Sequence, residues 1–349
     1  MDNQNKIPTG KIAAQLMIVI TAIMLAALAI RMMSHPSEVS LDSGHRMVMG
    51  TFARVIAVAA DKKTATAAIE AAVKEFNQVD SMMSGYKPDS QLSVVNRDAF
   101  ARPVEVDSRL FEVLHSAVEY SRKSAGAFDV TIGPLTDMWR KTADSGQKPT
   151  EADIAEARDK VGFEKLILNN ENMTVRFAVD GMRLDLGGIA KGYAIDLAVE
   201  AASRAGATGA MVDVGGDIRC FGKPAGDKEK WIIGLQDPDA DGKILLKLQM
   251  NDTAVATSGH YRRFVLIDGE KHSHIINPSA GNSAKKLTSV TIIAPTAIAA
   301  DALATATSVM GPEDGIKMIE ACENTEAILV EPDGDDYIYT TGAKTYTVK

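Results

Sequence analysis

Four glycine-punctuated segments carry more side chains able to do chemistry than packing alone requires. In the first, Gly187 and Gly188 precede a helical pattern and allow the backbone to approach a ligand closely. The N–H groups at the start of such a helix attract an anion, and Lys191 stands where it would meet phosphate charge. The segment matches neither a Walker A loop nor GxGxxG, so a strand–helix turn with a solvated lysine remains an alternative.

The second and third segments offer a carboxylate and an imidazole. Asp217 follows an apolar strand and two glycines, where it is either a ligand contact or part of a turn with its own hydrogen bond. His274 has the titration range to take a proton from a hydroxyl nucleophile, although a loop histidine is also often a structural hydrogen-bonding group. We expect His272, two residues earlier, to point the other way and to be solvated.

The fourth segment pairs Asp301 with Thr305. On a helix these residues are four apart and project from the same face. A carboxylate with a hydroxyl suits a hard cation such as Mg²⁺, which keeps its other positions for carbonyl, phosphate and water oxygens. Taken alone, the pair is explained as well by a threonine bonded to the helix backbone and an aspartate near the helix start. The four segments together decide the interpretation.

The elements that must position these segments are short strands mixed with helices, without a regular βαβ alternation. This pattern predicts an α+β fold with mixed, largely antiparallel sheets and flanking helices around a cleft. Residues 141–150 are polar and predict an exposed connection. We expect strands at 52–59, 165–168, 173–177, 210–214, 231–235, 244–250, 264–267 and 290–293, and helices at 62–80, 193–204, 296–310 and from Ser108, as N-cap, to about 124.

Composition excludes some classes of protein. The net charge of −8 and pI near 5.4 argue against a nucleic-acid partner, because phosphate backbones require a basic face. The two cysteines, Cys220 and Cys322, are far apart and lie in no CxxC motif, so a zinc site or disulfide framework is not expected. We favour two buried free thiols over a single disulfide.

The N-terminal segment predicts delivery across a membrane. Residues 12–29 carry no charge and are long enough to cross a bilayer core of about 30 Å. Basic residues precede them, which favours an inside N-terminus and an outside domain. The segment is either an uncleaved anchor or a signal peptide cut after Ala27-Leu28-Ala29.

These observations divide the chain into three parts. Residues 1–31 form the anchor or signal, 32–45 a linker, and 46–349 the working domain. We expect this domain at the bacterial inner membrane, facing the periplasm, or free in the periplasm if the signal is cleaved.

The residues of these segments and their order along the chain resemble those of the FAD:protein FMN transferase family, the ApbE-like proteins. Each segment alone is a weak signal, whereas seven in the right order are specific, and they extend over residues 46–349. The matching segments are 49–51, 84–86, 126–131, 185–196, 214–217, 274–278 and 300–305. This chain departs from the family pattern at Asn277 and Ser279, where the family usually has Asp and a basic residue.

The resemblance implies a flavin-dinucleotide cleft and a metal site. FAD would contact Met49, Tyr86, Ala127, Phe128, Asp129, Asp185, Lys191 and Ile275. Mg²⁺ would be bound by the carbonyl of Gly188 and the side chains of Asp301 and Thr305.

The implied reaction is Mg²⁺-dependent transfer of FMN from FAD to a threonine hydroxyl of a partner protein, with release of AMP. Lys191 would neutralise phosphate charge, His274 is the first candidate base and Asp217 the second. A membrane electron-transport subunit would fit as the acceptor. The alternatives are a Mg²⁺-dependent FAD pyrophosphatase that releases FMN and AMP, and a non-catalytic periplasmic flavin-binding protein.

Overall fold

The computed structural model describes residues 14, 16–26, 38–238, 240, 242–259, 264–267, 270–332 and 337–348. Residues 14 and 16–26 are helical and fall inside the predicted membrane segment 12–29, the rest of which lies outside the described residues. Within the described part of the chain, no helix has both the length and the apolar character needed to cross a membrane. The anchor or signal therefore stays a prediction.

A single sheet forms the centre of the fold. Its recorded strand pairs are all antiparallel, in the order β1-β3-β7-β8-β11-β14-β15-β16, with β2 on β3. All six residues of β14 are buried because this central strand is covered on both faces. The strands are β1 (Val39–Asp42), β2 (Arg46–Val48), β3 (Thr51–Ala59), β7 (Gly209–Val214), β8 (Asp217–Gly222), β11 (Ala254–Gly259), β14 (Ser289–Ala294), β15 (Glu326–Val330) and β16 (Tyr337–Tyr339).

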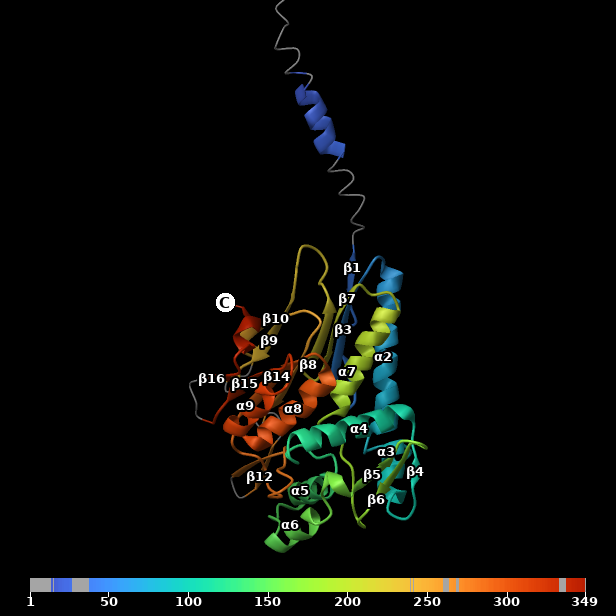
Figure 1. The fold of residues 1–349 in the computed structure, drawn as a ribbon, viewed down its shortest axis with the longest axis vertical. Helices are drawn as coiled ribbons and strands as arrows, with labels where there is room; N and C mark the ends of the chain where they lie inside the picture. The colour runs from blue at the N-terminus through green and yellow to red at the C-terminus, as the bar shows by residue number, and fades with distance from the viewer. Residues whose placement is uncertain are drawn as a thin grey trace, which may run out of the picture.

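Helices cover one face of this sheet (Figure 1). α2 begins after Asp61, whose carboxylate accepts a hydrogen bond from the N–H of Thr64 at 2.8 Å, and buries the expected apolar stripe. α8 is alanine-rich and almost wholly buried, as a helix enclosed on several sides must be. The covering helices are α2 (Lys62–Met83), α7 (Ala190–Arg204), α8 (Ala297–Met310) and α9 (Pro312–Glu320).

A second, three-stranded sheet packs against the opposite face. Its residues Trp231, Ile233 and Leu248 join a cluster with Ile218 and Ile293 of the central sheet. The neighbouring residue Ile292 packs on the other side, in the main core, because successive side chains of a strand point to opposite faces of the sheet. The strands are β9 (Trp231–Gln236), β10 (Ile244–Met250) and β17 (Thr347–Val348).

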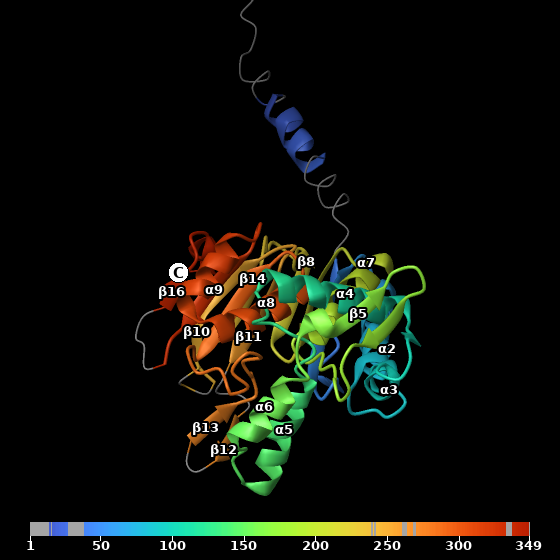
Figure 2. The same cartoon turned by 60° about the horizontal axis from the view of Figure 1, so that its bottom comes forward.

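The remaining elements gather at one end of the molecule (Figures 1 and 2). α4 crosses the ends of the covering helices, and α5 and α6 project beside the β12–β13 hairpin (Figure 2). They are α3 (Gln91–Asp98), β4 (Val104–Glu105), α4 (Ser108–Lys123), α5 (Gly133–Ser145), α6 (Glu151–Arg158), η1 (Phe163–Lys165), β5 (Leu166–Asn169), β6 (Thr174–Phe177), β12 (Phe264–Ile267) and β13 (Glu270–Ser273). The short helix η2 (Ala343–Tyr346) lies elsewhere, against β10 and β15.

The α+β class and the antiparallel sheets are confirmed, and three details of the prediction are wrong. The predicted linker contains β1, which pairs with β3 from Val39↔Ala59 to Asp42↔Ile56, so the folded domain begins before residue 46. The N-cap of α4 is Asp107 rather than Ser108, because the Asp107 carboxylate accepts from the N–H of Arg109. The first residues of the predicted connection 141–150 are the last turn of α5.

Both cysteines are free thiols, as predicted. Cys220 is buried in the layer between the two sheets, whereas Cys322 is only half-buried. Burial raises the pKa of the Cys220 thiol above its ordinary range, which keeps this thiol protonated and unreactive.

Candidate active site

Three of the predicted charged residues converge on one point. Lys191 lies in the first turn of α7, Asp217 is the first residue of β8, and Asp301 lies near the start of α8. The Lys191 Nζ donates to a carboxylate oxygen of Asp217 and lies 3.2 Å from Oδ1 of Asp301. Segments that are separated by up to 110 residues therefore build one centre.

Burial and mutual attraction set the charges in this centre. Both carboxylates are 4% exposed, and the Lys191 side chain is 30% exposed. Burial alone would lower the pKa of Lys191, but the two carboxylates outweigh it and hold that pKa above its ordinary value. Burial raises the pKa of Asp301 to about 6, while Lys191 acts against this shift.

The start of α7 donates to the protein's own carboxylate. The N–H of Gly192 lies 3.1 Å from Oδ2 of Asp301, so the anion expected at this helix start is Asp301. α7 and α8 approach so closely here that a Cβ at Gly192 would overlap the carbonyl of Ala297. Only glycine at this position allows the contact.

Asp196 fixes the same two helices to each other. Its Oδ1 accepts from the N–H of Ala297 at 2.8 Å, and its Oδ2 accepts from the N–H of Ile298 at 2.9 Å. Arg219 of β8 donates to Oδ1 at 2.7 Å and supplies the counter-charge. This buried carboxylate closes the start of α8 and thereby sets the position of Asp301 relative to Lys191.

Thr305 and Gly188 form a small oxygen-lined cradle beside Asp301. Thr305 is one helical turn after Asp301, and a Cβ at Gly188 would lie 2.9 Å from its Oγ1. The same Cβ would lie 3.3 Å from the ring of Phe128. A side chain at position 188 would therefore fill the space next to the hydroxyl, which suits a small cation with oxygen ligands.

Asp217 is oriented by the neighbouring strand. The N–H of Thr257 on β11 donates to Oδ1 of Asp217 at 3.1 Å, which leaves Oδ2 for Lys191. Thr257 in turn shares a hydrogen bond with Thr291 on β14, with 3.0 Å between the two hydroxyl oxygens. A local turn therefore does not account for Asp217, because its carboxylate contacts Lys191 on α7 and Thr257 on β11 rather than its own turn.

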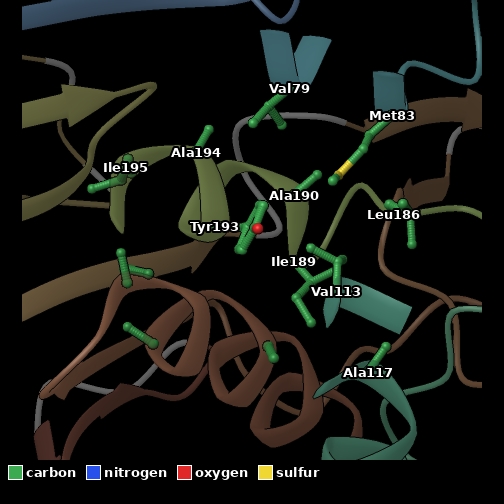
Figure 3. Close-up of a cluster of buried hydrophobic side chains, with 14 of the residues drawn as sticks. Val79, Met83, Val113, Ala117, Leu186, Ile189, Ala190, Tyr193, Ala194 and Ile195 are labelled. Atoms are coloured by element: carbon green, nitrogen blue, oxygen red, sulfur yellow. The ribbon is translucent and has the colours of Figure 1, made fainter. Parts of the chain in front are cut away.

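The segment behind Lys191 is rigid. Figure 3 shows Leu186, Ile189 and Tyr193 enclosed by side chains of α2 and α4. Tyr193 is 4% exposed and donates its hydroxyl to Glu112 at 2.8 Å. Lys191 therefore extends from a backbone that the main core holds in place.

Two of the predicted flavin contacts, Met49 and Tyr86, lie on turns. Met49 has a left-handed φ of 48° and packs partly against the main core. Tyr86 is 81% exposed, an uncommon state for a large aromatic side chain. Arg140 of α5 lies over its ring, 5.3 Å from the centroid.

Asp185 and Asp129 are both engaged by the protein. Asp185 accepts from the N–H of Gly187 at 2.9 Å and lies 3.2 Å from the Thr136 hydroxyl. Asp129 is buried, and its carboxylate accepts from the N–H and hydroxyl of Thr131 and from the N–H of Phe163. Burial raises the pKa of Asp129, against the effect of these hydrogen bonds.

The segment with the predicted base reaches the same region. His274 is exposed directly after β13, and the neighbouring Ile275 is buried. Ile275 packs in a small cluster with Val309 of α8 and with Ala127, another predicted flavin contact. Asn277, at the first departure from the family pattern, accepts from the N–H groups of Ser279 and Ala280 and closes a turn.

The prediction for His272 is wrong. This side chain is 6% exposed and stacks on Trp139, with 5.0 Å between the ring centroids and 27° between the ring planes. The reason is α5, a helix that the sequence pattern did not predict, which covers this side of β13 with an indole ring.

Three residues that the sequence analysis did not assign to the site share one property: each holds a predicted site residue in position. Asp196, Thr257 and Thr136 each position a predicted side chain. A buried aspartate inside an otherwise apolar helix was a readable signal for Asp196, since an unpaired buried carboxylate is costly. No local pattern marked the two threonines.

The fold and this centre define a class of protein: an α+β domain that brings an oxygen-lined cradle beside a partly exposed lysine and two buried carboxylates. The family follows from comparison with known sequences. The chain belongs to the ApbE family, whose model matches residues 49–329.

Similar proteins agree with this assignment. The chain is 33% identical over 305 residues to an FAD:protein FMN transferase of Treponema pallidum, covering 82% of this chain and 83% of the relative. It is 30% identical to an FAD:protein FMN transferase of Haemophilus influenzae, covering 90% and 93%. The ApbE protein of Thermotoga maritima superposes with a TM-score of 0.79 at 31% identity, covering 89% and 100%. The flavin transferase ApbE from Vibrio cholerae gives 0.76 at 28%, covering 88% and 99%.

Proposed function

We propose that this chain is a flavin transferase that moves FMN from FAD to a threonine hydroxyl of an acceptor protein, with Mg²⁺ bound and AMP released. The observation that carries the proposal is the convergence of Lys191, Asp217 and Asp301 beside the cradle of Gly188 and Thr305. The relatives from Treponema and Haemophilus are FAD:protein FMN transferases, which supports the transfer of FMN from FAD.

The donor set fits Mg²⁺. Asp301 and Thr305 would bind it through side-chain oxygens and Gly188 through its carbonyl, since hard cations prefer oxygen ligands. Bound Mg²⁺ would neutralise the negative charge of the pyrophosphate oxygens.

The side chains of the protein have distinct roles in the proposed reaction. The threonine oxygen of the acceptor forms a bond to the FMN-side phosphorus of FAD, and the bond from that phosphorus to the AMP oxygen breaks. His274 takes the hydroxyl proton, with Asp217 as the second candidate. Lys191 stabilises the charge that develops on the phosphoryl and leaving-group oxygens, the main catalytic task in such transfers.

The substrate would lie along the turns around this centre. Tyr86 offers an exposed ring to the flavin, and Met49 and Ala127 add apolar contacts. Phe128 is buried in the main core and would support the turn beneath the substrate. Asp129 contributes by fixing the 129–131 turn, because its carboxylate is already used by Thr131 and Phe163. Asp185 and Ile275 would border the rest of the dinucleotide.

The N-terminal segment suggests where the reaction occurs. Residues 1–31 would hold the domain at the inner membrane as an anchor, or direct it to the periplasm as a cleaved signal. An outward-facing enzyme at the membrane suits an acceptor in the same membrane, such as a subunit of an electron-transport complex.

The test is a transfer assay with the full chain, FAD, MgCl₂ and candidate acceptor subunits, followed by mass spectrometry of each acceptor. A mass gain equal to FMN that disappears with EDTA is the expected result. FMN and AMP without an acceptor gain would instead indicate a pyrophosphatase, and intact bound FAD a storage protein. Asp301→Ala is expected to abolish Mg²⁺-dependent transfer in a folded protein, and full activity of this variant would remove Asp301 from the metal site.

A further inference from the structure

Trp139 of α5 contacts the segment that carries His274 at two places. Its Nε1 donates to the carbonyl of Gly281 at 2.8 Å, and its ring stacks on His272 at 5.0 Å. His272 precedes His274 by two residues, and Gly281 follows it by seven. One indole ring therefore contacts both ends of the segment with the proposed base.

The segment between these two contacts is internally braced. The N–H of Ala284 donates to the carbonyl of Ile275 at 2.9 Å, and the N–H of Asn277 donates to the carbonyl of Asn282 at 2.8 Å. The hydroxyl of Ser283 donates to the carbonyl of Ser273 at 2.8 Å. These cross-links join the two halves of residues 273–284, so a contact at the ends of the segment acts on its whole length, including His274.

α5 is also fixed to the side of the site proposed for FAD. Thr136 contacts Asp185, and Arg140 lies over the ring of Tyr86. Asp137 forms ion pairs with Arg140 at 3.0 Å and with Arg183 at 3.1 Å. Trp139 thus connects the segment of the base to the same helix that contacts two proposed substrate residues.

We infer that Trp139 is a positioning residue, which holds the 273–284 segment against α5 and so places His274 relative to the bound substrate. The inference rests on the proposed function, because it takes His274 as the base. The alternative is that Trp139 only fills the small core that it shares with Leu135 and Ile276.

A matched control is built into the chain, which contains two tryptophans. Trp231 of β9 is 6% exposed and donates its Nε1 to the carbonyl of Gly222 at 3.1 Å, whereas Trp139 is 9% exposed. Trp139→Phe and Trp231→Phe therefore remove the same indole N–H from similar surroundings, one at the His274 segment and one between the two sheets.

The first measurement is hydrogen–deuterium exchange of the full chain without substrate. Trp139→Phe is expected to speed exchange of the amides of Asn277, Gly281 and Ala284, whose N–H groups brace the segment. Trp231→Phe is expected to leave them unchanged. Unchanged exchange in Trp139→Phe would overturn the inference, whatever the enzyme does.

The second measurement is the rate of AMP release from FAD, which reports transfer and hydrolysis alike. In Trp139→Phe we expect kcat to fall about 10- to 100-fold with the KM for FAD unchanged, because small misplacements of a reacting group cost up to about 10²-fold. In a His274→Ala background the same substitution is expected to have no further effect.

The outcomes separate the two proposals. An additive loss in the double variant, or a loss confined to KM, would show that Trp139 acts on the core or on binding and would overturn the inference. Full activity of His274→Ala alone would overturn the role of His274 in the proposed function. The exchange experiment would still decide whether Trp139 holds the segment.

Discussion

The ammonium group of Lys191 lies 3.2 Å from Oδ1 of Asp301, so the side chain that we assign to phosphate is the partner of the carboxylate that we assign to the metal. The same ammonium group also contacts Asp217. A cation bound by Asp301 would therefore compete with Lys191 for this oxygen, and Asp217 gives the lysine a second partner when that happens. Lys191 therefore keeps a carboxylate partner whether or not a cation occupies Asp301.

Removal of Lys191 tests this competition. In Lys191→Met we expect a lower free energy of unfolding, since two buried carboxylates lose their counter-charge. The loss should stay below the roughly 3–5 kcal/mol typical of fully buried pairs, because Lys191 is 30% exposed. MgCl₂ should recover more stability in the variant than in wild type. Urea unfolding with and without MgCl₂ measures both effects.

The control for Lys191 is Lys223→Met. Lys223 pairs with Glu229 at the surface, where the side chains are 60% and 75% exposed, so no change in stability or Mg²⁺ response is expected. An Mg²⁺ response of Lys191→Met equal to that of wild type would contradict the competition.

Gly188→Ala tests the oxygen-lined cradle. The added methyl group would lie 2.9 Å from Oγ1 of Thr305 and displace this hydroxyl or the turn. We expect Mg²⁺ binding, measured by calorimetry, to weaken by about 10-fold or more, as when supporting groups of a metal site are lost. Gly234→Ala in β9 is the control, because its methyl group meets only the flexible end of Ile244. Equal Mg²⁺ affinity in both variants would argue against the cradle.

Asp129→Asn separates a structural role from direct contact with FAD. Three donors point at this carboxylate, and an amide cannot accept from all of them. We expect a loss of about 1–3 kcal/mol in the free energy of unfolding. Asp314→Asn, at an exposed position on α9, is expected to cost nothing measurable.

The pH dependence of the Asp129→Asn effect has a defined sign. Burial holds the pKa of Asp129 above its ordinary value of 3.8, so the folded state binds this proton more tightly than the unfolded chain. Between the folded pKa and 3.8, the stability of wild type relative to Asp129→Asn should rise as the pH falls. Below 3.8 the difference should stop changing. A difference that falls with decreasing pH would show that the folded pKa lies below 3.8.

Tyr86 tests the proposed flavin contact. Tyr86→Ala is expected to weaken FAD binding by about 3- to 10-fold through loss of ring stacking, whereas Tyr86→Phe should bind nearly as wild type. Flavin fluorescence titration measures the dissociation constants. Tyr337→Ala on the edge strand β16 controls for removal of an exposed tyrosine. The same affinity in Tyr86→Ala and wild type would exclude stacking on this ring.

The sequence predicted the elements whose pattern is local. α2 has a clear apolar stripe on one face. In the β5–β6 hairpin, two short apolar strands lie on either side of the asparagine-rich turn 169–172. β1 could not be separated from a linker, because its four residues become a strand only through pairing with β3. α5 was missed because its first turn carries Gly133 and Pro134, which usually mark a loop when they occur together.

The individual residues of the candidate site could be predicted from the sequence, but their positions relative to one another could not. Lys191, Asp217 and Asp301 were each chosen from their neighbours in sequence, and alone each had an ordinary structural explanation. Their shared hydrogen bonds depend on how α7, β8 and α8 pack, which no local pattern specifies. Asp129 shows the opposite case, since a residue chosen for ligand contact instead accepts hydrogen bonds from the backbone N–H groups of Thr131 and Phe163.

Asp196 couples α7 to α8, because it accepts hydrogen bonds from two N–H groups at the start of α8 and from Arg219. Separating the two helices would leave all three donors without this partner. Lys191 and Asp301 thus sit on two helices that this carboxylate holds together. The 273–284 segment lies outside this pair of helices and is held by Trp139 of α5 instead. Loss of the Asp196 carboxylate should therefore shift Lys191 relative to Asp301 while the segment of His274 keeps its own support.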